Sequence, residues 1–173
     1  VGFWHTFHNP PWGGGNQFMI ALRNAFRRKG VKVIENRFND PDIHMLQSVW
    51  FDVDKIVSKI KNQKFKFVHR IDGPISLIRG RDQHLDDLCF RINQSAKATI
   101  IQSAWCYQRI LDLGYNPINP VIIHNAVDPT IFHNKGRIDF SRDRKIRLIS
   151  TSWSDNPRKG GKMYKWLDNN LDW

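Results

Sequence analysis

Hydrophobic side chains recur at helical spacing in the first third of the chain. Between residues 17 and 29 the apolar positions fall on one face of a helix, whereas Arg23, Arg27 and Arg28 fall on the opposite face. Gly30 follows directly and suits the C-terminal cap, because glycine adopts the left-handed backbone conformation at no steric cost. This pattern predicts an amphipathic helix with a basic outer face.

Strand-like and helix-like segments then alternate along the chain. Short apolar runs predict strands at 1–7, 31–35, 64–71, 97–103 and 120–125. Apolar residues at helical spacing predict helices at 53–60, at 85–92 and from Ser103 to Gly114, with Ser103 as the cap of the last. Strands that alternate with helices predict an α/β fold, with a Rossmann-like, open, mostly parallel sheet and helices on both faces.

The composition of the chain divides it into three parts. Residues 1–132 hold the alternating pattern, and residues 133–145 are charged and lack apolar periodicity, as linkers do. Residues 146–173 predict one further strand and helix, the beginning of a second α/β unit. We therefore expect the 173 residues to be a fragment of a longer protein.

The net charge of the chain indicates which kind of partner it binds. A formal charge of +11 and a pI near 10.0 favour an anionic partner: nucleic acid, an acidic membrane surface or a phosphorylated substrate. The sequence has no nucleic-acid recognition signature and its basic residues are dispersed. Specific nucleic-acid binding is therefore not expected, whereas non-specific binding stays an alternative.

The two cysteines, Cys89 and Cys106, favour buried, reduced thiols in a cytoplasmic protein. The apolar runs are too short to cross a bilayer.

Two glycine-containing loops each precede a predicted helix. In "NPPWGGGNQF", residues 9–18, backbone N–H groups at the helix start favour either an anion site or a tight turn. The loop matches neither the dinucleotide fingerprint nor the P-loop. In "SWSDNPRKGG", residues 152–161, Arg158 and Lys159 fall in the first helical turn, where cations oppose the helix dipole unless an anion lies nearby. The alternative is a solvated basic loop.

The stretch "HRIDGP" comes at the end of a predicted strand, where open α/β sheets bind ligands. His69, Arg70 and Asp72 offer a hydrogen-bonding group, a cation and a carboxylate there. The alternative is that Arg70 and Asp72 form an ion pair before a turn.

Two further patterns suggest metal binding, but neither is interpreted as a metal site. Asp52-Val53-Asp54 opens a predicted helix, where Asp serves as a cap, and His5-x-x-His8 lacks further ligands.

Taken in order, four segments give the chain a family resemblance. They are "NPPWGGGNQFMIALRNAFRRKGVKV", "ATIIQSAWCYQRILDLGY", "VIIHNAVDPTIF" and "STSWSDNPRKGG". With these motifs the chain resembles, over nearly its whole length, the N-terminal half of a GT-B glycosyltransferase of the retaining, family-four-like group. Ala126 departs from the glycine that the family usually has, and Ser154 from a phosphate-binding arginine of many members. The paired glutamates of the family belong to a later segment.

The resemblance implies an enzyme with two Rossmann-like domains, which transfers a sugar from a nucleotide-sugar co-substrate to an acceptor with retention of configuration and without a metal or other cofactor. It implies three groups of residues: catalytic His69 and Asp72; donor phosphate or sugar contacts from Gly13, Gly14, Gly15, Asn16, Arg158 and Lys159; and the cleft-lining Arg70, Gln102, Ser103 and Asn125. The basic helix at 17–29 would suit an anionic acceptor or a peripheral contact with an acidic membrane. The alternatives are a non-catalytic Rossmann-like module that binds an anionic sugar or nucleotide, and a basic nucleic-acid-binding protein.

Overall fold

The α/β sheet lies within one of two compact units of the chain. The computed structural model describes residues 1–9, 12–61, 65–80, 83–136, 149 and 159–171. Contacts group Val1–Pro10 with Gly14–Ala126 in the first unit, and Pro11–Gly13 with Val127–Trp173 in the second. The predicted domain boundaries at 132 and 145 stay predictions.

Six parallel strands form one open sheet in the order β2-β1-β3-β4-β5-β6. The strands are β1 (Gly2–Trp4), β2 (Ile34–Glu35), β3 (His44–Gln47), β4 (Phe67–Ile71), β5 (Ala98–Ile101) and β6 (Pro120–Ile122). The predicted fold class is confirmed: the chain is a Rossmann-like α/β fold whose helices are interleaved with the strands. The described sheet is parallel throughout.

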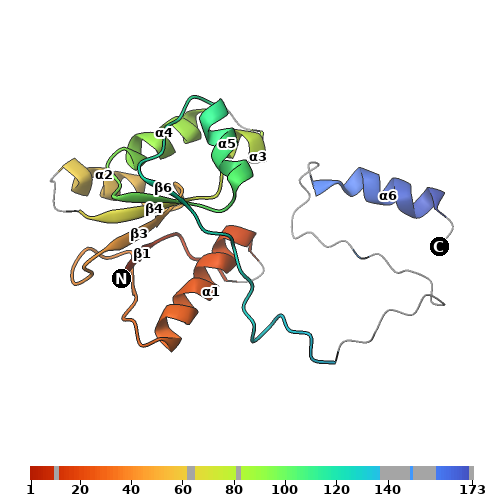
Figure 1. Ribbon diagram of the computed structural model, residues 1–173, viewed down its shortest axis with the longest axis horizontal. Helices are drawn as coiled ribbons and strands as arrows, with labels where there is room; N and C mark the ends of the chain where they lie inside the picture. The colour runs from red at the N-terminus through yellow and green to blue at the C-terminus, as the bar shows by residue number, and fades with distance from the viewer. Residues whose placement is uncertain (10–11, 62–64, 81–82, 137–148, 150–158, 172–173) are drawn as a thin grey trace. The chain divides into compact units, whose positions relative to one another are not determined.

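Helices cover both faces of the sheet (Figure 1). One face carries α1 (Gly14–Arg28), and the other carries α2 (Val53–Lys61), α3 (Ile75–Arg79), α4 (His84–Asn93) and α5 (Ala104–Asp112). Successive strand residues point to opposite faces, so Phe3 packs with Met19 of α1, whereas Trp4 packs in the cluster of Ile56 from α2. Apolar burial on both faces is typical of parallel sheets.

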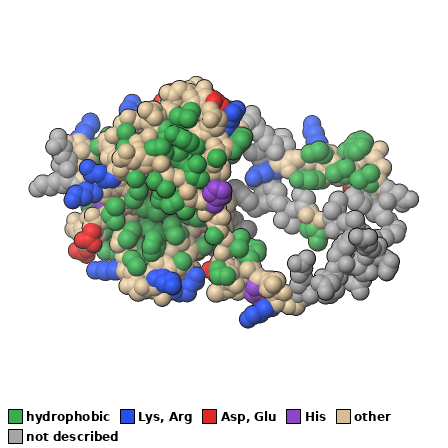
Figure 2. Space-filling view, in the orientation of Figure 1, with side chains coloured by type: hydrophobic (Ala, Val, Ile, Leu, Met, Phe, Trp, Pro, Cys, Tyr) green, Lys and Arg blue, Asp and Glu red, His purple; other side chains and the backbone are tan. Residues whose placement is uncertain are grey.

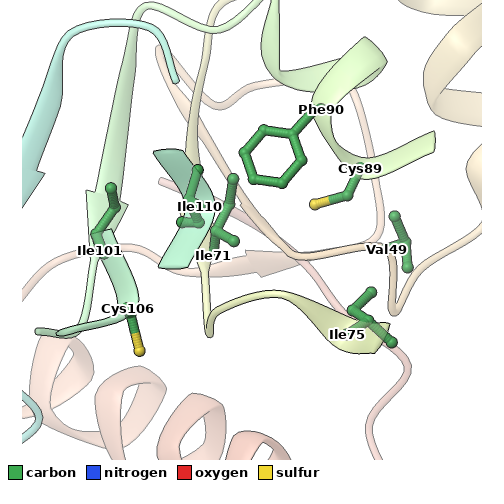
Figure 3. Packing of buried hydrophobic residues seen from close by; sticks show 8 residues of the cluster. All are labelled: Val49, Ile71, Ile75, Cys89, Phe90, Ile101, Cys106 and Ile110. Atoms are coloured by element: carbon green, nitrogen blue, oxygen red, sulfur yellow. The ribbon is translucent and has the colours of Figure 1, made fainter. Parts of the chain in front are cut away.

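A third apolar cluster joins β4 and β5 to the helices that follow them. Ile71 and Ile101 meet Phe90 of α4 and Ile110 of α5, as Figure 3 shows. The free thiols of Cys89 and Cys106 lie in the same cluster, which confirms that both cysteines are buried and unpaired.

The predicted caps are present. The Asp52 carboxylate accepts a hydrogen bond from the backbone N–H of Lys55 at 3.1 Å, and the Ser103 hydroxyl accepts one from that of Cys106 at 3.1 Å. Gly30 ends α1 with φ 75°. These two hydrogen bonds and the positive φ of Gly30 confirm that Asp52 and Ser103 cap helix starts and that Gly30 follows a helix end.

The sequence analysis missed two elements, β3 and α3. The strand β3 is four residues long and bears polar side chains at both ends, His44 and Gln47. Both are buried with partners, and the ring of His44 accepts a hydrogen bond from the Trp4 indole N–H at 3.0 Å. The sequence analysis predicted strands from apolar runs, and β3 is too short and too polar at its ends to form one.

The second unit holds the helix α6 (Gly161–Asn170). Of the predicted strand at 146–152, only Ile149 is among the described residues. Of the predicted linker at 133–145, residues 133–136 are described. Among the described residues, no helix is both long enough and apolar enough to cross a membrane.

Candidate functional site

The carboxyl ends of β1 and β3 mark the point where the chain reverses its direction across the sheet. From β1 the chain moves outward to β2, whereas from β3 it moves the other way through β4, β5 and β6. Loops at such a switch point diverge and leave a crevice, which is where open α/β sheets bind ligands. Of the residues predicted from "HRIDGP", His69 and Arg70 lie on the neighbouring strand β4, and Asp72 follows its last residue, Ile71.

Arg70 is the centre of a hydrogen-bonded network at this edge. Its side chain is only 2% exposed, and its guanidinium donates to the Gln47 side-chain oxygen at 2.7 Å, to Asp72, and to the Asn125 side-chain oxygen at 2.9 Å. The guanidinium carbon also lies 3.8 Å from the centre of the Phe18 ring, which adds a cation–π contact. Arg70 is therefore fixed from three strand ends and from α1.

Asp72 is the acidic group of the network and is 26% exposed. Its carboxylate accepts from Arg70 and, at 2.5 Å, from the Gln47 amide. A Cβ on Gly15 would stand 3.2 Å from Oδ2 of Asp72, so the first turn of α1 approaches this carboxylate closely. The positive end of the helix dipole stabilises a negative charge there.

Two amides close the network into a ring. The Gln102 side-chain N–H donates to the backbone carbonyl of Asp72, and the Asn125 side-chain N–H donates to the Gln102 side-chain oxygen at 2.9 Å. The structure thus brings together four of the predicted site residues, namely Arg70, Asp72, Gln102 and Asn125. It adds Gln47, which the sequence analysis missed because it did not find β3.

Two predicted contact residues have structural partners of their own. Asn16 is 3% exposed, and its side chain bonds the backbone N–H and the carbonyl of His8, both at 2.9 Å. The Ser103 hydroxyl caps α5. Both side chains hold local backbone in place, so we do not assign them a ligand.

His69 lies in the interior rather than at the open edge. Its ring is 0% exposed, with Nε2 2.7 Å from the Ser48 carbonyl and Nδ1 3.4 Å from the Asn93 amide nitrogen. Burial lowers the pKa of His69 to about 4, although the bond to Ser48 opposes the shift. This ring is neutral at pH 7 and does not share the exposed edge with Asp72. We therefore leave His69 out of the proposed catalytic group.

The remaining predicted donor contacts are distributed over the chain. Gly14 and Gly15 open α1, and a Cβ on Gly14 would meet nothing within 4 Å. Gly13 and Lys159 belong to the second unit, and Arg158 lies outside the described residues. A role for these three residues beside Asp72 stays a prediction.

His5 is a member of this region whose importance the sequence analysis missed. It follows β1 and is 4% exposed, and neither ring nitrogen has a hydrogen-bond partner of good geometry among the described residues, although the Asn16 side chain interacts with the ring. Burial lowers the pKa of His5; the nearby His8 and Arg70 lower it further, whereas Asn16 and Asp72 oppose the shift. A buried polar group without a partner costs free energy, which makes its ring a candidate for ligand contact. No sequence pattern reveals such burial.

The chemistry available at this edge is polar recognition by one carboxylate, one guanidinium and three amides. Within the described ranges no three His, Cys, Asp or Glu side chains come together as a metal-binding group. Comparisons of the chain with protein-family models, curated proteins and solved structures found no match.

Proposed function

We propose that the first unit is the acceptor-side domain of a retaining GT-B glycosyltransferase, and that residues 146–173 begin its donor-binding domain. The proposal rests on the four motifs with which the chain resembles that family and on the position of their residues. In this proposal a sugar is transferred from a nucleotide-sugar donor to an acceptor that remains to be identified.

The observation that carries the proposal is the polar ring around Arg70 and Asp72 at the switch point. Amides and carboxylates that converge at one edge suit the hydroxyl groups of a sugar, because each hydroxyl both donates and accepts hydrogen bonds. A carboxylate has about four acceptor positions, and the bonds from Arg70 and Gln47 use one on each oxygen of Asp72. Asp72 therefore keeps acceptor capacity on a partly exposed group.

The Asp72 carboxylate also affects which part of a donor can lie beside Gly15. Because Asp72 lies against the first turn of α1, a phosphate placed there would meet a like charge. The sequence analysis expected Gly15 to contact either the phosphate or the sugar of the donor. The like charge of Asp72 favours the sugar hydroxyl. Lys159 and Arg158 are then the candidates for neutralising the leaving diphosphate.

The test is calorimetric titration of the chain with UDP-, GDP- and ADP-sugars, for the wild type, Asp72→Asn and Asp112→Asn. Asp112 matches the change in charge but lies on α5, where it pairs with Arg109 at 2.7 Å. We expect at least one nucleotide sugar to bind the wild type and Asp112→Asn, and to bind Asp72→Asn about tenfold more weakly, since one charge-assisted hydrogen bond is lost. Absence of binding by every nucleotide sugar, or equal binding by Asp72→Asn, would argue against the proposal.

A second candidate is a non-catalytic module that binds an anionic sugar or nucleotide. It is favoured by the completeness of the polar ring, since all five members, Gln47, Arg70, Asp72, Gln102 and Asn125, lie within the first unit. The two candidates differ in turnover. Slow release of free sugar from a bound nucleotide sugar supports the enzyme, whereas binding with no turnover in the full-length protein supports the module.

A further inference from the structure

A groove at the β2 side of the sheet carries an excess of positive charge. Its volume is about 660 Å³, and it is lined by residues of and around β2, between Lys32 and Asp40, and by α2. The charged side chains that line it are four basic ones and one acidic one: Lys32, Arg37, Lys55, Lys59 and Asp40. None of these residues belongs to the polar ring around Arg70.

The Phe38 ring contacts two of the cations. Its ring centre lies 4.4 Å from that of Trp4, which fixes it over the sheet. The Lys59 ammonium is 5.0 Å from the Phe38 ring centre and the Lys55 ammonium is 5.7 Å from it. Like charges four residues apart on a helix repel each other, so an anion between these two ammonium groups would stabilise the arrangement.

The described residues do not neutralise this charge. Lys32 and Asp40 form a long, exposed pair at 3.9 Å, whereas no ion pair is found for Arg37, Lys55 or Lys59 in the part of the chain that the structure describes. Among the described residues, three positive charges of the groove therefore have no carboxylate partner.

The basic face of α1 is different. There Arg23 and Arg27 both pair with Glu35, at 3.3 Å and 2.8 Å. Two of the three arginines that predicted an anion-binding helix surface are therefore already paired. Figure 2 shows Lys and Arg side chains in several separate places on the face in view, rather than in one continuous patch.

We propose that the groove binds the phosphate group of a small phosphorylated molecule. A volume of about 660 Å³ is within the range of small-molecule sites. The guanidinium of Arg37 matches two phosphate oxygens, and the two ammonium groups add point charges. The polyanionic backbone of nucleic acid fits less well, because Asp52 and Asp54, both exposed, flank the start of α2 beside Lys55. This site does not depend on the glycosyltransferase proposal.

The test is titration of the chain with inorganic pyrophosphate at low ionic strength. The variant Lys55→Gln/Lys59→Gln removes two charges from the groove, and Lys61→Gln/Lys97→Gln removes two charges elsewhere on the first unit. We expect pyrophosphate to bind the wild type and the control variant, and to bind Lys55→Gln/Lys59→Gln at least about tenfold more weakly. Far-UV circular dichroism of the three proteins checks that each is folded.

A second arm distinguishes a lipid headgroup from a free phosphate. Vesicles of phosphatidylcholine with and without phosphatidic acid are sedimented with the same three proteins. Binding to the acidic vesicles that only the groove variant loses supports the site and assigns the phosphate to a lipid. The proposal is overturned if neither pyrophosphate nor acidic vesicles bind, if the two double variants lose binding equally, or if a DNA duplex binds more tightly than either probe and both variants weaken it alike.

Discussion

The first turn of α1 lies directly against the carboxylate of Asp72: a Cβ on Gly15 would be 3.2 Å from Oδ2. This close approach joins the start of α1 to the polar ring at the end of β4. It makes the first turn of α1 one wall of the candidate site and gives glycine a specific role at position 15.

Gly14→Ala and Gly15→Ala form a matched pair. Both add one methyl group in the first turn of α1, but a Cβ at Gly14 meets nothing within 4 Å. We expect Gly14→Ala to raise the free energy of unfolding by about 0.4–1 kcal/mol, because alanine restricts the unfolded chain. Gly15→Ala should gain less and should weaken nucleotide-sugar binding, since Asp72 must shift. Urea denaturation and calorimetry measure both effects, and equal behaviour of the two variants would contradict the contact.

Asp72→Ala leaves the Arg70 guanidinium buried without its carboxylate. Because Arg70 is 2% exposed, we expect a loss of about 3–5 kcal/mol in the free energy of unfolding. The double variant Asp72→Ala/Arg70→Leu removes the stranded charge and should recover part of the loss. Chemical denaturation of the wild type, Asp72→Ala, Arg70→Leu and the double variant gives the coupling energy. Simple additivity of the two substitutions would show that the pair is not coupled.

His69 makes stability depend on pH on the acidic side. Its pKa is about 4 in the folded protein, below the ordinary value of 6.5, so the unfolded state binds the proton more readily. The free energy of unfolding therefore falls as pH drops from 6.5 to 4, by on the order of 3 kcal/mol from this group. His69→Gln keeps an N–H donor for the Ser48 carbonyl and should flatten this part of the curve. His44, whose pKa burial also lowers to about 4, remains in both proteins. Identical pH curves for the two proteins would argue against a buried, neutral His69.

The thiols report on the packing of the third cluster. Cys89 is 1% exposed and Cys106 is 4% exposed, and burial raises the pKa of the Cys89 thiol well above its ordinary value. We expect neither thiol to react with Ellman's reagent in the native protein, and both to react in 6 M guanidinium chloride. Rapid reaction of one thiol under native conditions would mean that α4 or α5 opens locally.

Periodicity was enough to predict α1, α2, α4 and α5, because each buries one apolar face. It was not enough for β3, whose ends His44 and Gln47 are polar and find their partners across the sheet. The short helix α3 was missed after "HRIDGP", where a Gly-Pro turn was expected. Partners across the sheet overrode the local pattern in β3. At the start of α3 the Asp86 carboxylate accepts hydrogen bonds from the backbone N–H groups of Ile75 and Ser76, a tertiary contact that periodicity does not reveal.

The candidate site was predictable to the extent that strand ends meet at one edge of a parallel sheet. That rule was enough to place Arg70 and Asp72 at the edge of the sheet. The structure also shows the Arg70–Asp72 ion pair, which the sequence analysis gave as the alternative to a ligand site. The rule does not say which way a side chain points, so it grouped His69 with its neighbours although alternate strand residues face opposite sides. The burial of the His5 ring results from packing against residues that are distant in the sequence, and one sequence does not reveal such packing.

Mapping of amide chemical shifts with a ¹⁵N-labelled chain tests the central claim most directly. A nucleotide sugar that binds should shift the backbone amides of Gly15, Asp72, Gln102 and Asn125, and should leave Lys97, at the opposite end of β5, unchanged. At a ligand concentration about ten times the wild-type Kd, the same amides should shift only about half as far in Asp72→Asn, as tenfold weaker binding requires. Shifts spread evenly over the basic surface, or confined to residues away from Asp72, would contradict a sugar site at the strand ends.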